Sequence, residues 1–174
     1  MWLARQTPEK VLPILHRVIG AATDEFADAV ANGGGVYAVG YCFGGKYVCL
    51  LAANQAAPAE KKKKLGDEEQ GAKEEGGPLI KCGALAHGTM ITREDLEGIR
   101  VPVSMVCVEQ DPLFSDEVRV SGKEYLEKEG REFEMRVYEK VPHGFAVVGE
   151  FADAGIRTKQ AEAFEQMVGW LKGH

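Results

Sequence analysis

Six consecutive residues, Gly-Tyr-Cys-Phe-Gly-Gly at 40–45, constrain the fold of this chain more than any other segment. The apolar run before them, 36–39, is typical of a β-strand, and the apolar run after them, 47–53, fits a helix. Where a strand turns sharply into a helix, bulky side chains two residues before and two residues after the apex would collide with the adjoining elements, and glycine avoids both collisions. The pattern therefore predicts a tight strand-to-helix turn with Cys42 at its apex.

Cys42 at such an apex matches the G-x-S-x-G nucleophile elbow, with cysteine in place of serine. Its sulfur would lie at a helix N-terminus, where the helix dipole favours the thiolate. The alternative is that Cys42 is a small buried hydrophobic residue, as most cysteines are. We interpret Cys42 as a candidate nucleophile, and the backbone N–H of Phe43, the next residue, as a candidate oxyanion-hole donor.

A nucleophile elbow requires an acid and then a histidine, in that order along the chain and each just after a strand. Asp111 follows the β-rich run 101–108, and His143 follows the alternating run 133–138. Taken singly, Asp111 also fits a turn aspartate before a proline, and His143 a loop histidine. The ordered set favours Asp111 as the acid that orients the imidazole and His143 as the base that activates the thiol. Asp116 is the alternative acid, but its place near a helix start favours capping.

Apolar runs and helical patterns alternate along the chain, which predicts a parallel α/β sheet with helices on both faces and right-handed crossovers. This alternation and the length of 174 residues fit one domain spanning 1–174. The expected strands are 36–41, 80–86, 101–108 and 133–138, and the expected helices are 8–31, 44–53, 115–128 and 159–172. Ligands of such sheets bind at the carboxyl ends of the strands, which is where the three candidate residues are expected.

Charge and cysteine content narrow the possible partners and the compartment. A net charge of −6 and a pI near 5.3 argue against nucleic acid or an anionic membrane as the main partner. No apolar stretch is long enough to span a bilayer. The four cysteines, at 42, 49, 82 and 107, show no C-x-x-C spacing, so we expect a reduced cytoplasmic protein without disulfides or a zinc site. Cys49, inside an expected helix, is expected in the core.

Residues 56–78 form a charge-rich, low-complexity segment between the expected elbow helix and the next strand. Its six acidic residues and five lysines, four of them consecutive at 61–64, nearly cancel each other. A basic signal is one interpretation of the lysines. The composition instead favours a solvated loop that buries no apolar surface, so we expect 59–77 to be mobile.

Three pieces in this order, GYCFGG at 40–45, EQDPLF at 109–114 and VPHGF at 141–145, resemble the dienelactone hydrolase family. The similarity extends from about residue 8 to the C-terminus, and the closing helix is similar to that of the fungal-type branch. The resemblance implies an α/β-hydrolase fold and a Cys-Asp-His triad that hydrolyses a small-molecule ester or lactone without a metal or organic cofactor.

The resemblance also implies roles for individual residues. Cys42 would be the nucleophile, Asp111 the orienting acid and His143 the base. The candidate substrate-binding residues are Tyr41, His87 and Phe145. For His87, which closes the expected strand 80–86, the alternative is a structural role at the strand end.

The chain departs from the family pattern on its N-terminal side. Residues 1–35 are mostly helical in pattern, whereas the family has further strands before the elbow. We therefore expect those strands to be absent, together with the second oxyanion-hole donor, whose loss costs about 10²–10³ in turnover. The strand at 36–41 would then be an unpaired edge, which favours self-association.

A second departure concerns the substrate. Family members that take dienelactone bind its carboxylate through arginines, and the fungal-type pattern usually has arginine where Val148 stands. Residues 143–150 contain no arginine, so we expect neutral esters or lactones. The competing interpretations are a truncated chain that is silent or serves as a binding scaffold, and a redox-sensitive thiol at Cys42.

Overall fold

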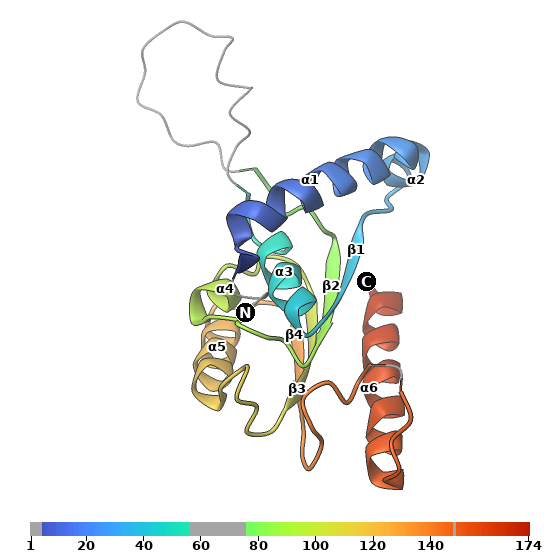
Figure 1. Cartoon of the computed structure of the whole chain (residues 1–174). Coiled ribbons are helices and arrows are strands. Elements are labelled where there is room, and N and C mark those ends of the chain that lie inside the picture. Colours follow the sequence, from blue (N-terminus) through green and yellow to red (C-terminus); the bar gives the residue numbers. More distant parts are fainter. Residues whose placement is uncertain (1–4, 56–75, 148) are drawn as a thin grey trace, which may run out of the picture.

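The computed structural model describes residues 5–55, 76–147 and 149–174. Its centre is a four-stranded sheet made of β1 (Tyr37–Tyr41), β2 (Cys82–Ala86), β3 (Val103–Val108) and β4 (Phe133–Tyr138) (Figure 1). All neighbouring strands are parallel, and their order across the sheet is β1-β2-β3-β4. This confirms the predicted parallel α/β class and all four predicted strands, with boundaries that differ by at most two residues at either end.

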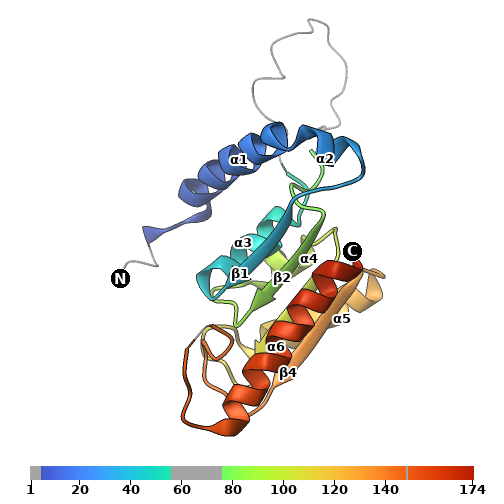
Figure 2. The ribbon, with the colours of Figure 1, turned by 90° about the vertical axis from the view of Figure 1, so that its right-hand side faces the viewer.

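Helices cover both faces of the sheet. One face carries α3 (Phe43–Leu51), α4 (Arg93–Glu97) and α5 (Asp116–Lys128), and the other carries α6 (Ala154–Gly173) (Figure 2). Side chains of the central strands pack alternately against the helices on one face and on the other, because successive side chains of a strand point to opposite faces of the sheet. Met105 and Cys107 join the cluster under α3 and α5, whereas Val106 joins the cluster under α6.

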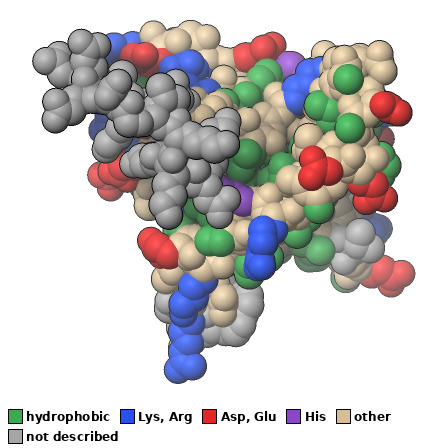
Figure 3. Space-filling view, turned by 90° about the horizontal axis from the view of Figure 1, so that it is seen from above, with side chains coloured by type: hydrophobic (Ala, Val, Ile, Leu, Met, Phe, Trp, Pro, Cys, Tyr) green, Lys and Arg blue, Asp and Glu red, His purple; other side chains and the backbone are tan. Residues whose placement is uncertain are grey.

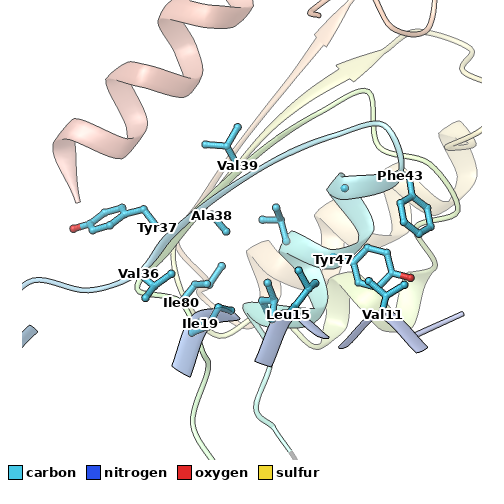
Figure 4. Close-up of a pocket in the computed structure, with 13 residues that line it drawn as sticks. Val11, Leu15, Ile19, Val36, Tyr37, Ala38, Val39, Phe43, Tyr47 and Ile80 are labelled. Atoms are coloured by element: carbon cyan, nitrogen blue, oxygen red, sulfur yellow. The ribbon is translucent and has the colours of Figure 1, made fainter. Parts of the chain in front are cut away.

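The N-terminal segment is less tightly joined to the sheet. The helix expected over 8–31 is divided at Phe26, whose backbone is not helical, into α1 (Pro8–Glu25) and α2 (Ala27–Ala31). None of the residues of α1 is buried. Its partly buried side chains face β1 and α3 across an apolar cavity of about 370 Å³ (Figure 4). Seen from the side of α1, hydrophobic side chains lie among charged ones at the surface (Figure 3).

Two helix starts differ from the sequence prediction because of N-caps. The closing helix was expected from residue 159 but α6 begins at Ala154, where the Asp153 carboxylate accepts a hydrogen bond from the N–H of Ile156 (3.1 Å). The short helix α4 was not predicted. A capping box forms its start, since Thr92 and Asp95 each bond the other's backbone N–H.

The charged segment 56–78 lies almost wholly outside the described residues. The prediction that 59–77 is mobile therefore stays a prediction. Its two ends are joined by an antiparallel bridge, in which the N–H of Gln55 donates to the carbonyl of Gly76 (2.8 Å). Among the helices of the described ranges, none combines the length and apolar character needed to cross a membrane.

Candidate active site

The carboxyl ends of the strands bring the three candidate residues together. Cys42 directly follows β1, Asp111 lies three residues past the end of β3, and His143 lies on the loop after β4. The Nδ1 atom of His143 lies 2.7 Å from Oδ2 of Asp111, and its Nε2 atom lies 3.3 Å from Sγ of Cys42. One continuous hydrogen-bonded chain therefore links carboxylate, imidazole and thiol, as the sequence order predicted.

The backbone of Cys42 is strained in the way an elbow requires. Its φ of 51° and ψ of −117° lie outside the regions that L-residues ordinarily occupy. A Cβ atom at Gly40 would lie 2.4 Å from the carbonyl oxygen of Gly44, so β1 and the start of α3 touch backbone to backbone. The predicted collision at the other glycine is wrong: apart from its two chain neighbours and the nearby backbone of α3, no atom of the described residues lies within 4 Å of a Cβ built at Gly44. Gly45 is the crowded position instead, since a Cβ atom built there would lie 3.0 Å from the Cα of Gly88.

Asp111 is placed to orient the imidazole. It is 3% exposed, and both of its carboxylate oxygens are engaged: Oδ2 accepts from Nδ1 of His143, and Oδ1 accepts from the N–H of Leu113 (3.0 Å). With Nδ1 as the donor, Nε2 is the ring atom that faces the sulfur. Asp116, the alternative acid, is the first residue of α5 and forms an ion pair with Arg119 (2.8 Å). The cap of α5 is Ser115 rather than Asp116.

The pKa values of the thiol and the imidazole are shifted toward each other. Partial burial raises the pKa of Cys42, but hydrogen bonds with Thr89, His143 and the backbone of Phe43 outweigh it and hold the value below the ordinary one. Burial lowers the pKa of His143, but hydrogen bonds with Cys42 and Asp111 outweigh it and hold the value above the ordinary one. Both shifts favour a thiolate–imidazolium pair.

The other three cysteines have the opposite environment. Cys49, Cys82 and Cys107 are free thiols with no exposed surface, so Cys49 lies in the core as predicted. Burial raises the pKa of all three thiols, that of Cys107 to about 12. Cys42 is thus distinguished from them by both access and electrostatics.

The three candidate substrate-binding residues differ in exposure. Tyr41 is 37% exposed, whereas His87 is 1% and Phe145 0% exposed. The ring of His87 lies against that of His143 (centroids 5.0 Å apart), with Phe145 behind it (6.5 Å). These two buried side chains therefore support His143 from within and offer almost no surface to a substrate. Burial and the nearby His143 lower the pKa of His87 to about 4, so it is neutral at pH 7.

Thr89 joins the site although the sequence does not single it out. Its Oγ1 atom lies 3.2 Å from Sγ of Cys42 and 3.3 Å from Nε2 of His143. It lies on the turn that follows β2, two residues after His87. No local pattern marks this threonine, because the contact arises only when the sheet brings three strand ends together.

Strained backbone marks the same edge of the sheet. Cys42, His87, Gln110 and Lys140, which follow β1, β2, β3 and β4 respectively, all have positive φ angles between 38° and 54°. Such conformations cost about 1–3 kcal/mol each and are found preferentially at functional sites. The position where the family carries an arginine, Val148, lies outside the described residues. Within those residues, no group of three or more His, Cys, Asp and Glu side chains is arranged to hold a metal ion.

A cysteine on a strained strand-to-helix turn, followed along the chain by an aspartate and a histidine after later parallel strands, defines the class of α/β-hydrolase folds. Within that class, the model of the dienelactone hydrolase family matches residues 70–174, which is more than half of the chain. The chain belongs to the dienelactone hydrolase family.

Two curated hydrolases and one solved structure are similar to this chain. The hydrolase tropI of Talaromyces stipitatus is 30% identical over 134 residues, covering 77% of this chain and 44% of that protein. The hydrolase pyvD of Aspergillus violaceofuscus is 25% identical over 170 residues, covering 98% of this chain and 58% of that protein. The crystal structure of a candidate dienelactone hydrolase from Klebsiella pneumoniae matches with a TM-score of 0.56 at 16% identity, covering 88% of this chain and 60% of that one. This chain spans about half the length of these two curated relatives.

Proposed function

We propose that this chain hydrolyses a small neutral ester or lactone, with Cys42 as nucleophile, His143 as base and Asp111 as the residue that orients His143. The observation that carries the proposal is the hydrogen-bonded chain from Asp111 through His143 to Cys42, at 2.7 and 3.3 Å. The opposite pKa shifts of thiol and imidazole support it, because they favour the nucleophilic thiolate near neutral pH.

The chemistry follows in two steps. The Cys42 thiolate attacks the carbonyl carbon, a C–S bond forms, and the backbone N–H of Phe43 hydrogen-bonds the developing oxyanion. The C–O bond then breaks, and the His143 imidazolium protonates the departing alcohol, which leaves an acyl-thioenzyme. Water attacks this thioester while His143 takes its proton. The C–S bond breaks, the carboxylic acid leaves, and the Cys42 thiolate beside the His143 imidazolium is restored.

The sequence around His143 supports a neutral substrate. Residues 143–150 contain no arginine, and Glu150 adds a negative charge there. A carboxylate on the substrate would lack a bidentate partner from this stretch. A catalytic thiol also requires reducing conditions, so we retain a cytoplasmic location as part of the proposal.

A panel of p-nitrophenyl esters and simple lactones tests the proposal. The chain should hydrolyse at least one neutral member, and Cys42→Ala or His143→Ala should each lower kcat by about 10³-fold or more. Asp111→Asn should lower kcat less, since it removes orientation rather than the reacting atoms.

A buried cysteine supplies the matched control. Cys49→Ala should leave hydrolysis nearly unchanged, and iodoacetamide should label Cys42 before the other three thiols, as mass spectrometry can resolve. Hydrolysis that survives Cys42→Ala, or absence of turnover combined with slow labelling of Cys42, would contradict the proposed function.

A further inference from the structure

The turn between β2 and α4 is fixed to the strand ends that carry the candidate residues. The N–H of Thr89 donates to the carbonyl of Cys42 (3.0 Å), and the N–H of Met90 donates to the carbonyl of Leu113 (3.0 Å). His87 and Met90, on either side of Thr89, both have positive φ angles, 38° and 58°. Thr89 is therefore held beside Cys42 and the Asp111 loop by two backbone hydrogen bonds, on a turn whose flanking residues are strained.

The hydroxyl of Thr89 occupies a position enclosed by the reacting atoms. Thr89 is 1% exposed, so bulk water does not compete for its hydrogen bonds. Its Oγ1 lies 3.2 Å from Sγ of Cys42 and 3.3 Å from Nε2 of His143, and these two atoms are themselves 3.3 Å apart. Oxygen, sulfur and nitrogen thus form a nearly equilateral triangle.

The protons available to this triangle decide what the hydroxyl does. The proton on Nδ1 of His143 is donated to Asp111 and takes no part in the triangle. Oγ1, Sγ and Nε2 therefore share two protons, the hydroxyl proton of Thr89 and one that moves between Sγ and Nε2. When that proton is on Nε2, the imidazolium has no free lone pair, and the hydroxyl of Thr89 can donate only to the sulfur. A hydrogen bond to an ionised acceptor is about twice as strong as one to a neutral acceptor.

We propose that Thr89 is a positioning residue whose hydroxyl donates to the thiolate of Cys42 and stabilises the thiolate–imidazolium pair. The inference rests on the proposed function and deepens it, since it adds a fourth residue to the reacting cluster. The titratable groups that face the pair are His143 itself, Asp111 behind it and the neutral His87 beside it. All three are unchanged by substitution of Thr89.

The role implies a specific trade-off. Attack by sulfur converts the thiolate into a thioester, which is a poor hydrogen-bond acceptor, so the hydroxyl stabilises the thiolate before attack more than the state after it. Removing the hydroxyl should lower the fraction of thiolate near neutral pH. It should also raise the reactivity of each thiolate that does form, because nucleophilicity increases with thiol pKa.

The test measures the rate of Cys42 alkylation by iodoacetamide between pH 5 and pH 10. Thr89→Val keeps the shape of the side chain without the hydroxyl, and it should move the midpoint of the rate profile upward by about one pH unit. Below the midpoint alkylation should be about threefold to fourfold slower, because the higher reactivity of each thiolate offsets part of the tenfold loss of thiolate. On the high-pH plateau the rate should equal or exceed that of the unmodified chain. Thr89→Ser, which restores the hydroxyl, should return the midpoint, and thermal melting should show that all variants are folded.

Further variants separate this role from packing and from the proposed function. Thr158→Val, the same change on the exposed face of α6, should leave the profile unchanged. In a His143→Ala background, Thr89→Val should still raise the midpoint, so the Thr89 effect can be measured even if the triad hypothesis fails. An unchanged midpoint in Thr89→Val, or an equal rise in Thr89→Val and Thr89→Ser, would overturn the inference.

Discussion

The imidazole of His87 is buried beside that of His143, and neither of its ring nitrogens has a hydrogen-bond partner in the described part of the chain. An unpartnered buried imidazole is destabilising, and a charged one would be more so. Burial is therefore the main cause of the low pKa of His87, and His143 adds to it, because protonation would place a second cation against the His143 imidazolium. Because His87 is neutral, the only charges it faces in this cluster of described residues are those of the Cys42 thiolate, the His143 imidazolium and the Asp111 carboxylate.

His87 should therefore make folding stability depend on pH. Its pKa is about 4 when folded and 6.5 ordinarily, so between these values the unfolded chain binds a proton that the folded chain does not. Stability should be complete above pH 6.5 and fall as the pH decreases toward 4, by at most about 1.4 kcal/mol per pH unit. His87→Asn, which tolerates a positive φ, should show a flatter dependence in urea denaturation.

The exposed His16 on α1 provides the matched control, since His16→Asn should follow the pH dependence of the unmodified chain. The contribution of His143 is common to every variant and cancels in the comparison. Parallel stability curves for the unmodified chain and His87→Asn would contradict the assigned environment of His87.

At the level of elements, the junction of β1 with α3 depends on one glycine more than on the other. A Cβ at Gly40 would meet backbone atoms of Gly44 at 2.4 and 2.5 Å, which cannot move without displacing the helix. Gly40→Ala should therefore lower the free energy of unfolding by about 2 kcal/mol or more, in the range of overpacked cores. It should also slow alkylation of Cys42 by shifting the elbow.

Gly44→Ala is the matched substitution four residues away. Apart from its chain neighbours and the nearby backbone of α3, the new Cβ meets no described atom within 4 Å, and it lies inside α3, where alanine is favoured over glycine by about 0.5–1 kcal/mol. Urea denaturation should show an unchanged or slightly raised stability for Gly44→Ala. Equal losses at the two glycines would mean that the contact between β1 and α3 differs from the one described.

The candidate site could be predicted from sequence to the extent that it depends on strand ends. Cys42, Asp111 and His143 each follow a recognisable strand, and parallel strands present their carboxyl ends on one edge. Thr89 could not be found this way, because its contacts depend on how far the β2 turn reaches across to β1 and β4. The helix α4 did have a local signal, the capping box of Thr92 and Asp95, whereas the division at Phe26 has none in the sequence.

At the scale of the whole molecule, the two edges of the sheet differ in how they are protected. Within the described residues, β1 pairs only with β2, and β4 only with β3. β4 carries Glu134 and Arg136, and charged side chains discourage pairing of an edge with another chain. β1 has no charged residue, and its Tyr37, Val39 and Tyr41 are 39%, 51% and 37% exposed on alternate positions. The edge beside Cys42 is therefore the less protected one.

We expect the chain to self-associate through β1, with two copies pairing antiparallel about Val39, the middle residue of the strand. In a two-fold arrangement Val39 faces its own copy, so Val39→Lys places two like charges opposite each other and a lysine on the edge. Sedimentation over a range of concentrations should show a dissociation constant weakened at least about tenfold by this change, since like charges across strands are destabilising. Val120→Lys, the same change at a 45% exposed position on α5, should have no effect. A monomer at every concentration, or equal behaviour of the two variants, would show that β1 is protected by something other than a second copy.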